Sequence, residues 1–204
     1  MDDVVTEILK VPGGRLVRLS GGGSFKVPYA LFGAYPLKAG QRLDTDEYQR
    51  QTSLIEARVA LEQAARLLEA REKSRAELTG KLMDAGYSEE AAQGAADKLQ
   101  SLGYLDDRRY AAGLIARLGK RYGVFRLKQE LVRRGIPKAV ADELLEAHDP
   151  QAGLEAAVAI ARKALRGKSA DPRAARQKAY AALARRGYGA DVIRQALREA
   201  ETGD

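Results

Sequence analysis

Two groups of basic side chains in the C-terminal half have the composition of a phosphate-binding surface. The cations between residues 117 and 138 are opposed only by Glu130. This first group comprises Arg117, Lys120, Arg121, Arg126, Lys128, Arg133, Arg134 and Lys138. The second group comprises Arg162, Lys163, Arg166, Lys168, Arg173, Arg176, Lys178, Arg185 and Arg186. If both groups face one concave groove, they would neutralise phosphates and release counterions, which gives salt-sensitive, sequence-tolerant binding to DNA.

Part of this charge has another explanation. Arg133-Arg134 and Arg185-Arg186 each precede a glycine that can end a helix, where cations are favoured by the helix dipole. That explanation does not cover the four cations nearest the Tyr122-Gly123 turn, which are Arg117, Lys120, Arg121 and Arg126. Tyr122 and Phe125 could stack on bases there, although an aromatic residue at a helix junction is more often part of the core.

Three patterns that could suggest catalysis are incomplete. Gly167-Lys168-Ser169 ends like a phosphate-binding loop, but the earlier glycine is replaced by Arg162 and a helical pattern precedes it. His148 has no catalytic partner and lies near a predicted helix end, where a capping role is favoured. Asp106 and Asp107 are adjacent and point apart, so they make a poor Mg²⁺ site. We therefore predict no enzymatic activity, no cofactor and no metal.

Composition supports a binding protein. The chain of 204 residues has no cysteine and one histidine, which excludes thiolate chemistry and argues against zinc or haem. Its net charge of +7 is uneven, because residues 1–100 hold 14 Lys and Arg against 15 Asp and Glu, and the remainder hold 21 against 13. A cationic field confined to one half favours a polyanion or an acidic protein as partner, although such charge can also serve solubility alone. Residues 1–10 contain no leader-like apolar stretch, and no later run could span a bilayer, so we expect a cytoplasmic protein.

The elements that would carry these side chains are strands followed by helices. Short β-type runs occupy residues 4–9, 15–19 and 25–27, and the glycine-rich stretches between them predict turns. From Asp44 onward four helix starts are marked. They are the capping-box pairs Asp44 with Glu47 and Ser74 with Glu77, and the Asp-Pro pairs at 149–150 and 171–172.

An internal repeat of about fifty residues organises the helical part. Apolar residues stand eight and four positions before Gly86, Gly135 and Gly187, and a large apolar residue follows each glycine. A glycine that ends a helix in the left-handed conformation lets the next residue pack back on the last turn. We predict a mainly α fold of tandem three-helix repeats in an elongated curved array, with an N-terminal β-hairpin or meander. The expected parts are a β segment at 1–43 and helical repeats at 44–105, 106–148 and 149–204.

The segment between the first two repeats is identified as a structural junction. It reads Gly103-Tyr104-Leu105-Asp106-Asp107-Arg108-Arg109-Tyr110-Ala111. Asp106 can cap the next helix, Asp107 suits its positive end, and Tyr104, Leu105 and Tyr110 can wedge two bundles together.

This junction resembles a signature of the RecX family. The segment Leu127 to Ile136 is similar to the second signature of that family, and residues 71–78 and 37–43 resemble its first repeat and N-terminal region. The resemblance runs from about residue 37 to the C-terminus. The third repeat is rich in alanine and matches only in pattern, and strands before residue 30 are less general in the family.

The resemblance implies a monomeric modulator of the RecA recombinase. Such a protein lies in the groove of the RecA filament on single-stranded DNA. It inhibits strand exchange, ATP turnover and the cleavage of the SOS repressor, and so regulates DNA repair. The recognition contacts would come from the second and third repeats, whereas Arg109 belongs to the junction motif.

The residues themselves leave a second class open. The protein could be an independent DNA-binding architectural protein, or a transcriptional regulator that uses a helix-turn-helix-like pair. A regulator should prefer one DNA sequence and dimerise, whereas a filament modulator should act on RecA without sequence preference.

Overall fold

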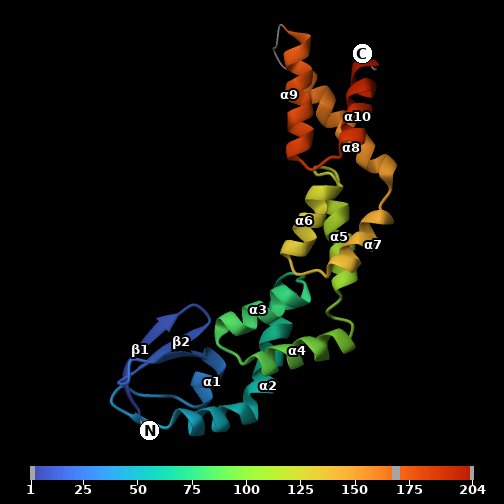
Figure 1. Ribbon diagram of the computed structural model, residues 1–204. Helices are drawn as coiled ribbons and strands as arrows, with labels where there is room; N and C mark the ends of the chain where they lie inside the picture. The colour runs from blue at the N-terminus through green and yellow to red at the C-terminus, as the bar shows by residue number, and fades with distance from the viewer. Residues whose placement is uncertain (1–2, 167–170, 203–204) are drawn as a thin grey trace. The chain divides into compact units, whose positions relative to one another are not determined.

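The described part of the protein is mainly helical and falls into two compact units. A computed structural model describes residues 3–166 and 171–202. The units are Met1–Asp106 and Asp107–Asp204, and Figure 1 shows the antiparallel strands and the helices that compose them. This architecture confirms the predicted mainly α fold of three-helix repeats with strands at the N-terminus. None of the described helices is long and apolar enough to cross a membrane.

The first unit begins with an antiparallel sheet of four strands in the order β3-β2-β1-β4. The strands are β1 (Asp3–Val11), β2 (Gly14–Leu19), β3 (Ser24–Pro28) and β4 (Arg42–Leu43). Gly13 and Gly22 have φ of 83° and 84° in the turns between the first three strands. Since this left-handed region is strained for other residues, the glycines permit the turns that the sequence predicted.

Two short elements that precede the first long helix were not predicted from the sequence. Helix α1 (Tyr29–Ala34) follows β3, and β4 pairs with β1 through Asp3 opposite Leu43. A strand of two residues is too short to carry a periodic pattern, and its existence depends on a partner far away in the sequence.

The first three-helix repeat completes this unit. It comprises α2 (Thr45–Ala70), α3 (Arg75–Ala85) and α4 (Glu89–Ser101). Ser74 and Glu77 form the predicted reciprocal capping box. Asp44 caps α2 by accepting from the backbone of Asp46 and Glu47, but the Glu47 carboxylate bonds to Arg50 and Gln51 instead. The predicted box at Asp44 is therefore only half formed, because a cation one turn on attracts the carboxylate.

The sheet and the first repeat share one hydrophobic core. Val5 and Val17 of the sheet are fully buried in the same cluster as Leu78 and Leu82 of α3. At the end of α3, Gly86 lies so close to β3 that a Cβ atom there would be 2.8 Å from the carbonyl oxygen of Lys26. The N-terminal strands thus pack directly on the first repeat.

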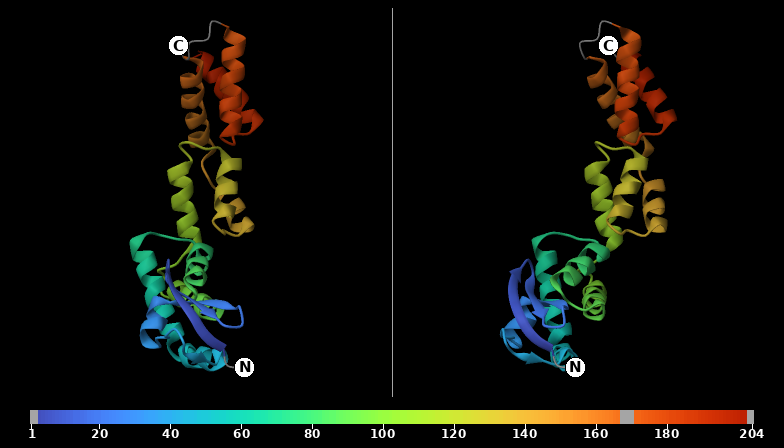
Figure 2. Two further views of the ribbon diagram at one scale, coloured as in Figure 1. Left: turned by 90° about the vertical axis from the view of Figure 1, so that its left-hand side faces the viewer. Right: turned by 60° about the vertical axis from the view of Figure 1, so that its left-hand side comes forward.

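The second unit consists of two three-helix groups. The first is α5 (Asp107–Leu118), α6 (Val124–Arg133) and α7 (Lys138–Glu146); the second is α8 (Pro150–Leu165), α9 (Pro172–Arg185) and α10 (Ala190–Thr202). Figure 2 shows the helices of each group side by side in both views. Asp149 and Asp171 cap α8 and α9 with proline at the first helical position, as predicted.

The predicted repeat is confirmed at its helix ends. Gly86, Gly135 and Gly187 all have positive φ. The residue after each glycine is buried and donates its backbone N–H to the carbonyl of the apolar residue four positions before the glycine. These pairs are Tyr87 with Leu82 (3.1 Å), Ile136 with Leu131 (3.1 Å) and Tyr188 with Leu183 (3.3 Å). The same helix-ending motif therefore recurs in all three repeats.

Candidate functional site

The N-terminus of α6 is joined to the C-terminal end of α9 by backbone hydrogen bonds. Helix α6 starts after Gly123, which offers no capping side chain. Instead, the N–H of Gly123 donates to the carbonyl of Arg186 (2.9 Å), and the N–H of Phe125 donates to the carbonyl of Gly187 (3.2 Å). The unsatisfied donors of one helix thus meet the unsatisfied acceptors of another, with opposite ends of the two dipoles together.

This junction requires glycine on both sides. A Cβ atom at Gly123 would lie 2.4 Å from the carbonyl oxygen of Gly187, and one at Gly187 would lie 2.5 Å from the backbone nitrogen of Arg126. The two chain segments can approach only without side chains. The contact fixes the second repeat against the third and brings the Tyr122-Gly123 turn to the end of α9.

A basic hollow forms where the turn meets the third repeat. It has a volume of about 540 Å³. Its lining residues are Lys120, Arg121, Tyr122, Ile160, Lys163, Ala164, Ala182 and Arg186. Four of these are exposed cations, drawn from both predicted basic groups, and none of the described lining residues is acidic. Four like charges around one concavity repel one another and attract a multivalent anion.

The cations of the basic hollow are not paired with carboxylates of the described residues. The Arg186 guanidinium donates to the carbonyl of Ala182 (3.0 Å), and the Arg121 guanidinium lies 5.9 Å from the ring centre of Tyr122. Within the described ranges, neither arginine has a carboxylate partner, nor do Lys120 and Lys163. A phosphate that enters would therefore not have to displace an internal ion pair.

Other predicted binding residues have partners inside the protein. Lys128 pairs with Asp142. Arg176 pairs with Glu201 (3.3 Å). Arg133 and Arg134 both contact Glu130 (2.6 and 3.0 Å), and Arg134 also donates to the Tyr110 hydroxyl (2.6 Å). These interactions give the four cations a structural role.

The remaining predicted cations are exposed but do not line the basic hollow. They are Arg117, Arg126, Lys138, Arg162, Arg166, Arg173, Lys178 and Arg185. Phe125 is 63% exposed, whereas Tyr122 packs partly against the core of the second repeat. Of the two predicted stacking residues, only Phe125 therefore presents most of its surface to solvent. Lys168 and the Gly167-Lys168-Ser169 pattern lie outside the described residues.

The Glu130 contacts predict a dependence of stability on pH. Hydrogen bonds from Arg133 and then Arg134 hold the pKa of Glu130 below its usual value. A carboxylate with a lowered native pKa stabilises the fold above its unfolded pKa of about 4.3, and this contribution is lost as the pH falls through the native pKa. We expect Glu130→Gln to remove this part of the acid-induced loss of stability. The measurement is urea unfolding at neutral and at acidic pH, followed at the backbone amides of α6. The same change at Glu155, which is exposed and has no hydrogen bond or ion pair from its side chain among the described residues, should leave the loss intact. Equal profiles for both variants would contradict this assignment.

Residues of the junction motif contribute to the hydrophobic cores of both units. Leu105 is buried in the core of the first unit and Tyr110 in that of the second repeat, while Tyr104 is 67% exposed. Helix α5 begins at Asp107, directly after Asp106, and Arg109 is exposed on its first turn.

The motif also ties α5 to α7, which the sequence did not reveal. Arg108 makes a bidentate pair with Glu143 at 2.9 and 2.5 Å. The hydrogen bond from Arg108 lowers the pKa of Glu143. A charge pair 35 positions apart in the sequence has no local signal.

The predicted role of His148 as a helix cap was wrong. Its imidazole makes no hydrogen bond with any described residue, and its Nε2 atom lies 3.3 Å from where a Cβ atom of Gly119 would stand. The side chain packs against the end of α5 because Gly119 leaves room for it. Among the described residues, no group of three or more His, Asp or Glu side chains could hold a metal ion.

Comparison with known proteins gives the same family for all three repeats. Models of the first, second and third three-helix domains of RecX match residues 60–99, 106–145 and 151–197. The regulatory protein RecX of Leptothrix cholodnii is 39% identical over 141 residues, which cover 68% of this chain and 87% of that protein. The regulatory protein RecX of Deinococcus radiodurans is 38% identical over 162 residues, which cover 78% and 73% of the two chains.

Solved structures share the fold. A crystal structure of regulatory protein RecX has a TM-score of 0.66 at 22% identity, covering 97% of this chain and 99% of the other. The crystal structure of RecX from Lactobacillus salivarius has a TM-score of 0.68, covering 72% and 97%. Since the three domain models match in order and the relatives align over most of their lengths, this chain belongs to the RecX family.

Proposed function

We propose that this protein is a negative modulator of RecA that binds the groove of the RecA filament on single-stranded DNA. There it inhibits strand exchange, ATP turnover and cleavage of the SOS repressor, in the regulation of recombination and DNA repair. Its effect is steric and electrostatic, not catalytic, and it acts as a cytoplasmic monomer. The relatives are named regulatory proteins, which supports a role in regulation.

The observation that carries this proposal is the basic hollow. Lys120 and Arg121 of the second repeat face the same concavity as Lys163 and Arg186 of the third. Such a site recognises the regular phosphates of a nucleic acid, or acidic groups of a filament, without reading base sequence. The backbone junction at Gly123 and Gly187 fixes the distance between the two pairs of cations, so the site is preorganised for its partner.

The decisive experiment measures the DNA-dependent ATPase of RecA while this protein is titrated in. It is run at two salt concentrations, beside a direct assay of binding to single- and double-stranded DNA. We expect inhibition well below one copy per RecA, at concentrations where free DNA is hardly bound. Tight DNA binding with no effect on RecA would contradict the proposal and favour an independent DNA-binding protein. A marked preference for one DNA sequence would favour a transcriptional regulator.

A further inference from the structure

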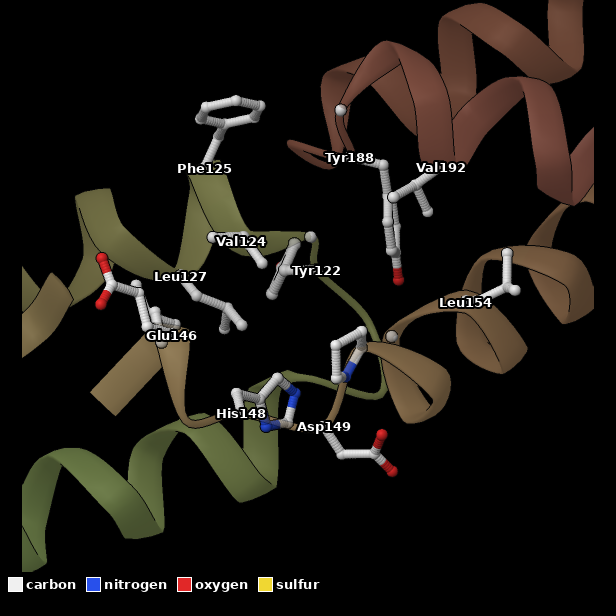
Figure 3. A pocket seen from close by; sticks show the side chains of 15 residues that line it. Tyr122, Val124, Phe125, Leu127, Glu146, His148, Asp149, Leu154, Tyr188 and Val192 are labelled. Atoms are coloured by element: carbon white, nitrogen blue, oxygen red, sulfur yellow. The ribbon is translucent and has the colours of Figure 1, made fainter. Parts of the chain in front are cut away.

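A second concavity in this unit has a different chemical character. It has a volume of about 300 Å³ and lies between the start of α6, the segment that joins α7 to α8, and the start of α10. Its apolar wall is formed by Val124, Leu127, Leu145, Leu154 and Val192. Figure 3 shows Val124, Leu127, Leu154 and Val192 of this wall gathered around it with Tyr122, Tyr188 and His148, while Phe125 points away. This apolar pocket is thus lined by both repeats.

The apolar pocket contains an unsatisfied polar group. Tyr188 is only 6% exposed, and its buried hydroxyl makes no hydrogen bond with any described residue. In Figure 3 the hydroxyl points between the His148-Asp149 turn and Leu154. Burial raises the pKa of Tyr188, so the hydroxyl keeps its proton and can donate it in a hydrogen bond. A buried donor without an acceptor is unfavourable, which gives a ligand with an acceptor an advantage.

The surrounding charges select against anions. The charged residues among the described lining are Glu146 and Asp149, and neither Lys nor Arg is present there. One oxygen of Asp149 already accepts from the backbone of Gln151 (2.9 Å) to cap α8. Phosphates and carboxylates would be repelled, in contrast to the basic hollow. The aromatic rings and aliphatic side chains favour a flat, uncharged molecule.

We propose that the apolar pocket binds a small neutral aromatic molecule that carries one hydrogen-bond acceptor. The ring packs against the aliphatic wall and the Tyr122 ring, and the acceptor receives the Tyr188 hydroxyl. An apolar cavity of about 150 Å³ can hold benzene, so this volume suits a single substituted ring. The site uses none of the cations of the basic hollow, although Tyr122 borders both concavities.

Two probes of similar size test the proposal on the full chain. Acetophenone carries a carbonyl acceptor on its ring, and ethylbenzene carries none. The methyl groups of the aliphatic wall report binding through ¹³C methyl NMR. We expect saturable shifts at Val124, Leu154 and Val192, with an acetophenone dissociation constant in the millimolar range or below, as suits a ligand of about nine heavy atoms. Ethylbenzene should bind about three- to tenfold more weakly, because it leaves the hydroxyl unpaired.

Three variants separate recognition from folding. Tyr188→Phe should weaken acetophenone binding about three- to tenfold and leave ethylbenzene unchanged. Tyr180→Phe is the matched control, since Tyr180 is 41% exposed on α9 and lies outside the apolar pocket, and it should change neither. Gly153→Leu should fold, because a Cβ atom there meets nothing within 4 Å, and its side chain should block both probes.

Two outcomes would overturn the proposal. The first is an absence of saturable methyl shifts with either probe. The second is equal acetophenone affinity in the native chain and in Tyr188→Phe, which would mean that the hydroxyl makes no hydrogen bond to the ligand. Loss of acetophenone binding in Gly153→Leu, with its methyl spectrum otherwise folded, would support the location.

Discussion

Gly187→Ala is expected to destabilise the second unit by about 3 to 4 kcal/mol. Alanine at a φ of +80° costs about 1 to 2 kcal/mol by itself. Its Cβ atom would also lie 2.5 Å from the backbone nitrogen of Arg126, so the end of α9 must move away from α6. That movement breaks the two hydrogen bonds donated by Gly123 and Phe125, each worth roughly 1 kcal/mol.

Gly103→Ala is the matched control for this prediction. Gly103 also follows a helix and has a φ of +76°, but a Cβ atom there meets nothing within 4 Å. We expect it to lose only about 1 to 2 kcal/mol from the left-handed conformation. Urea unfolding followed by amide hydrogen exchange gives the free energy of unfolding of each unit separately. The Gly123 and Phe125 amides should lose protection only in Gly187→Ala. Equal losses in both variants would show that the contact between α6 and α9 contributes nothing.

Reversing two charges in the basic hollow is expected to weaken binding to the RecA filament by at least about tenfold. Arg121→Glu with Lys163→Glu changes one cation in each of the two repeats that form the hollow. The double variant removes two phosphate contacts and adds repulsion, so the slope of log affinity against log salt should fall by about 1.4 on single-stranded DNA. Filament binding and binding to single-stranded DNA, each measured over a range of salt concentrations, test the two effects.

A second double variant controls for net charge. Arg58→Glu with Arg66→Glu changes the charge by the same amount on α2, in the first unit. Arg58 pairs with Glu62 (2.6 Å) and both positions are exposed. We expect little change in affinity or in the salt slope. Similar losses in the two double variants would mean that net charge, rather than the basic hollow, determines binding.

Local signals in the sequence were sufficient for the framework of the fold. A capping side chain or a left-handed glycine acts within one turn of its own helix, so the starts at Ser74, Asp149 and Asp171 and the ends at Gly86 and Gly135 could be predicted. The family resemblance rested on the junction motif and is confirmed by the domain matches.

Contacts between distant segments could not be predicted in the same way. The sequence indicated that Gly187 ends a helix, but it did not indicate that Gly123 packs against Gly187. It also gave seventeen candidate cations without showing that four of them, among them Lys128 and Arg134, have acidic partners within the protein. Which charges remain for a partner depends on side chains brought together by folding, as with Asp142 and Lys128.

The backbone bonds between α6 and α9 have a consequence for biosynthesis. The ribosome releases the chain from its N-terminus, so α6 emerges well before Arg186 and Gly187. Until then the first amides of α6 have no acceptor except water, and a chain arrested before residue 187 should leave that helix end frayed. The second repeat is therefore completed only by a segment that is synthesised about sixty residues after α6 begins, and a product truncated before Arg186 would lack a finished basic hollow.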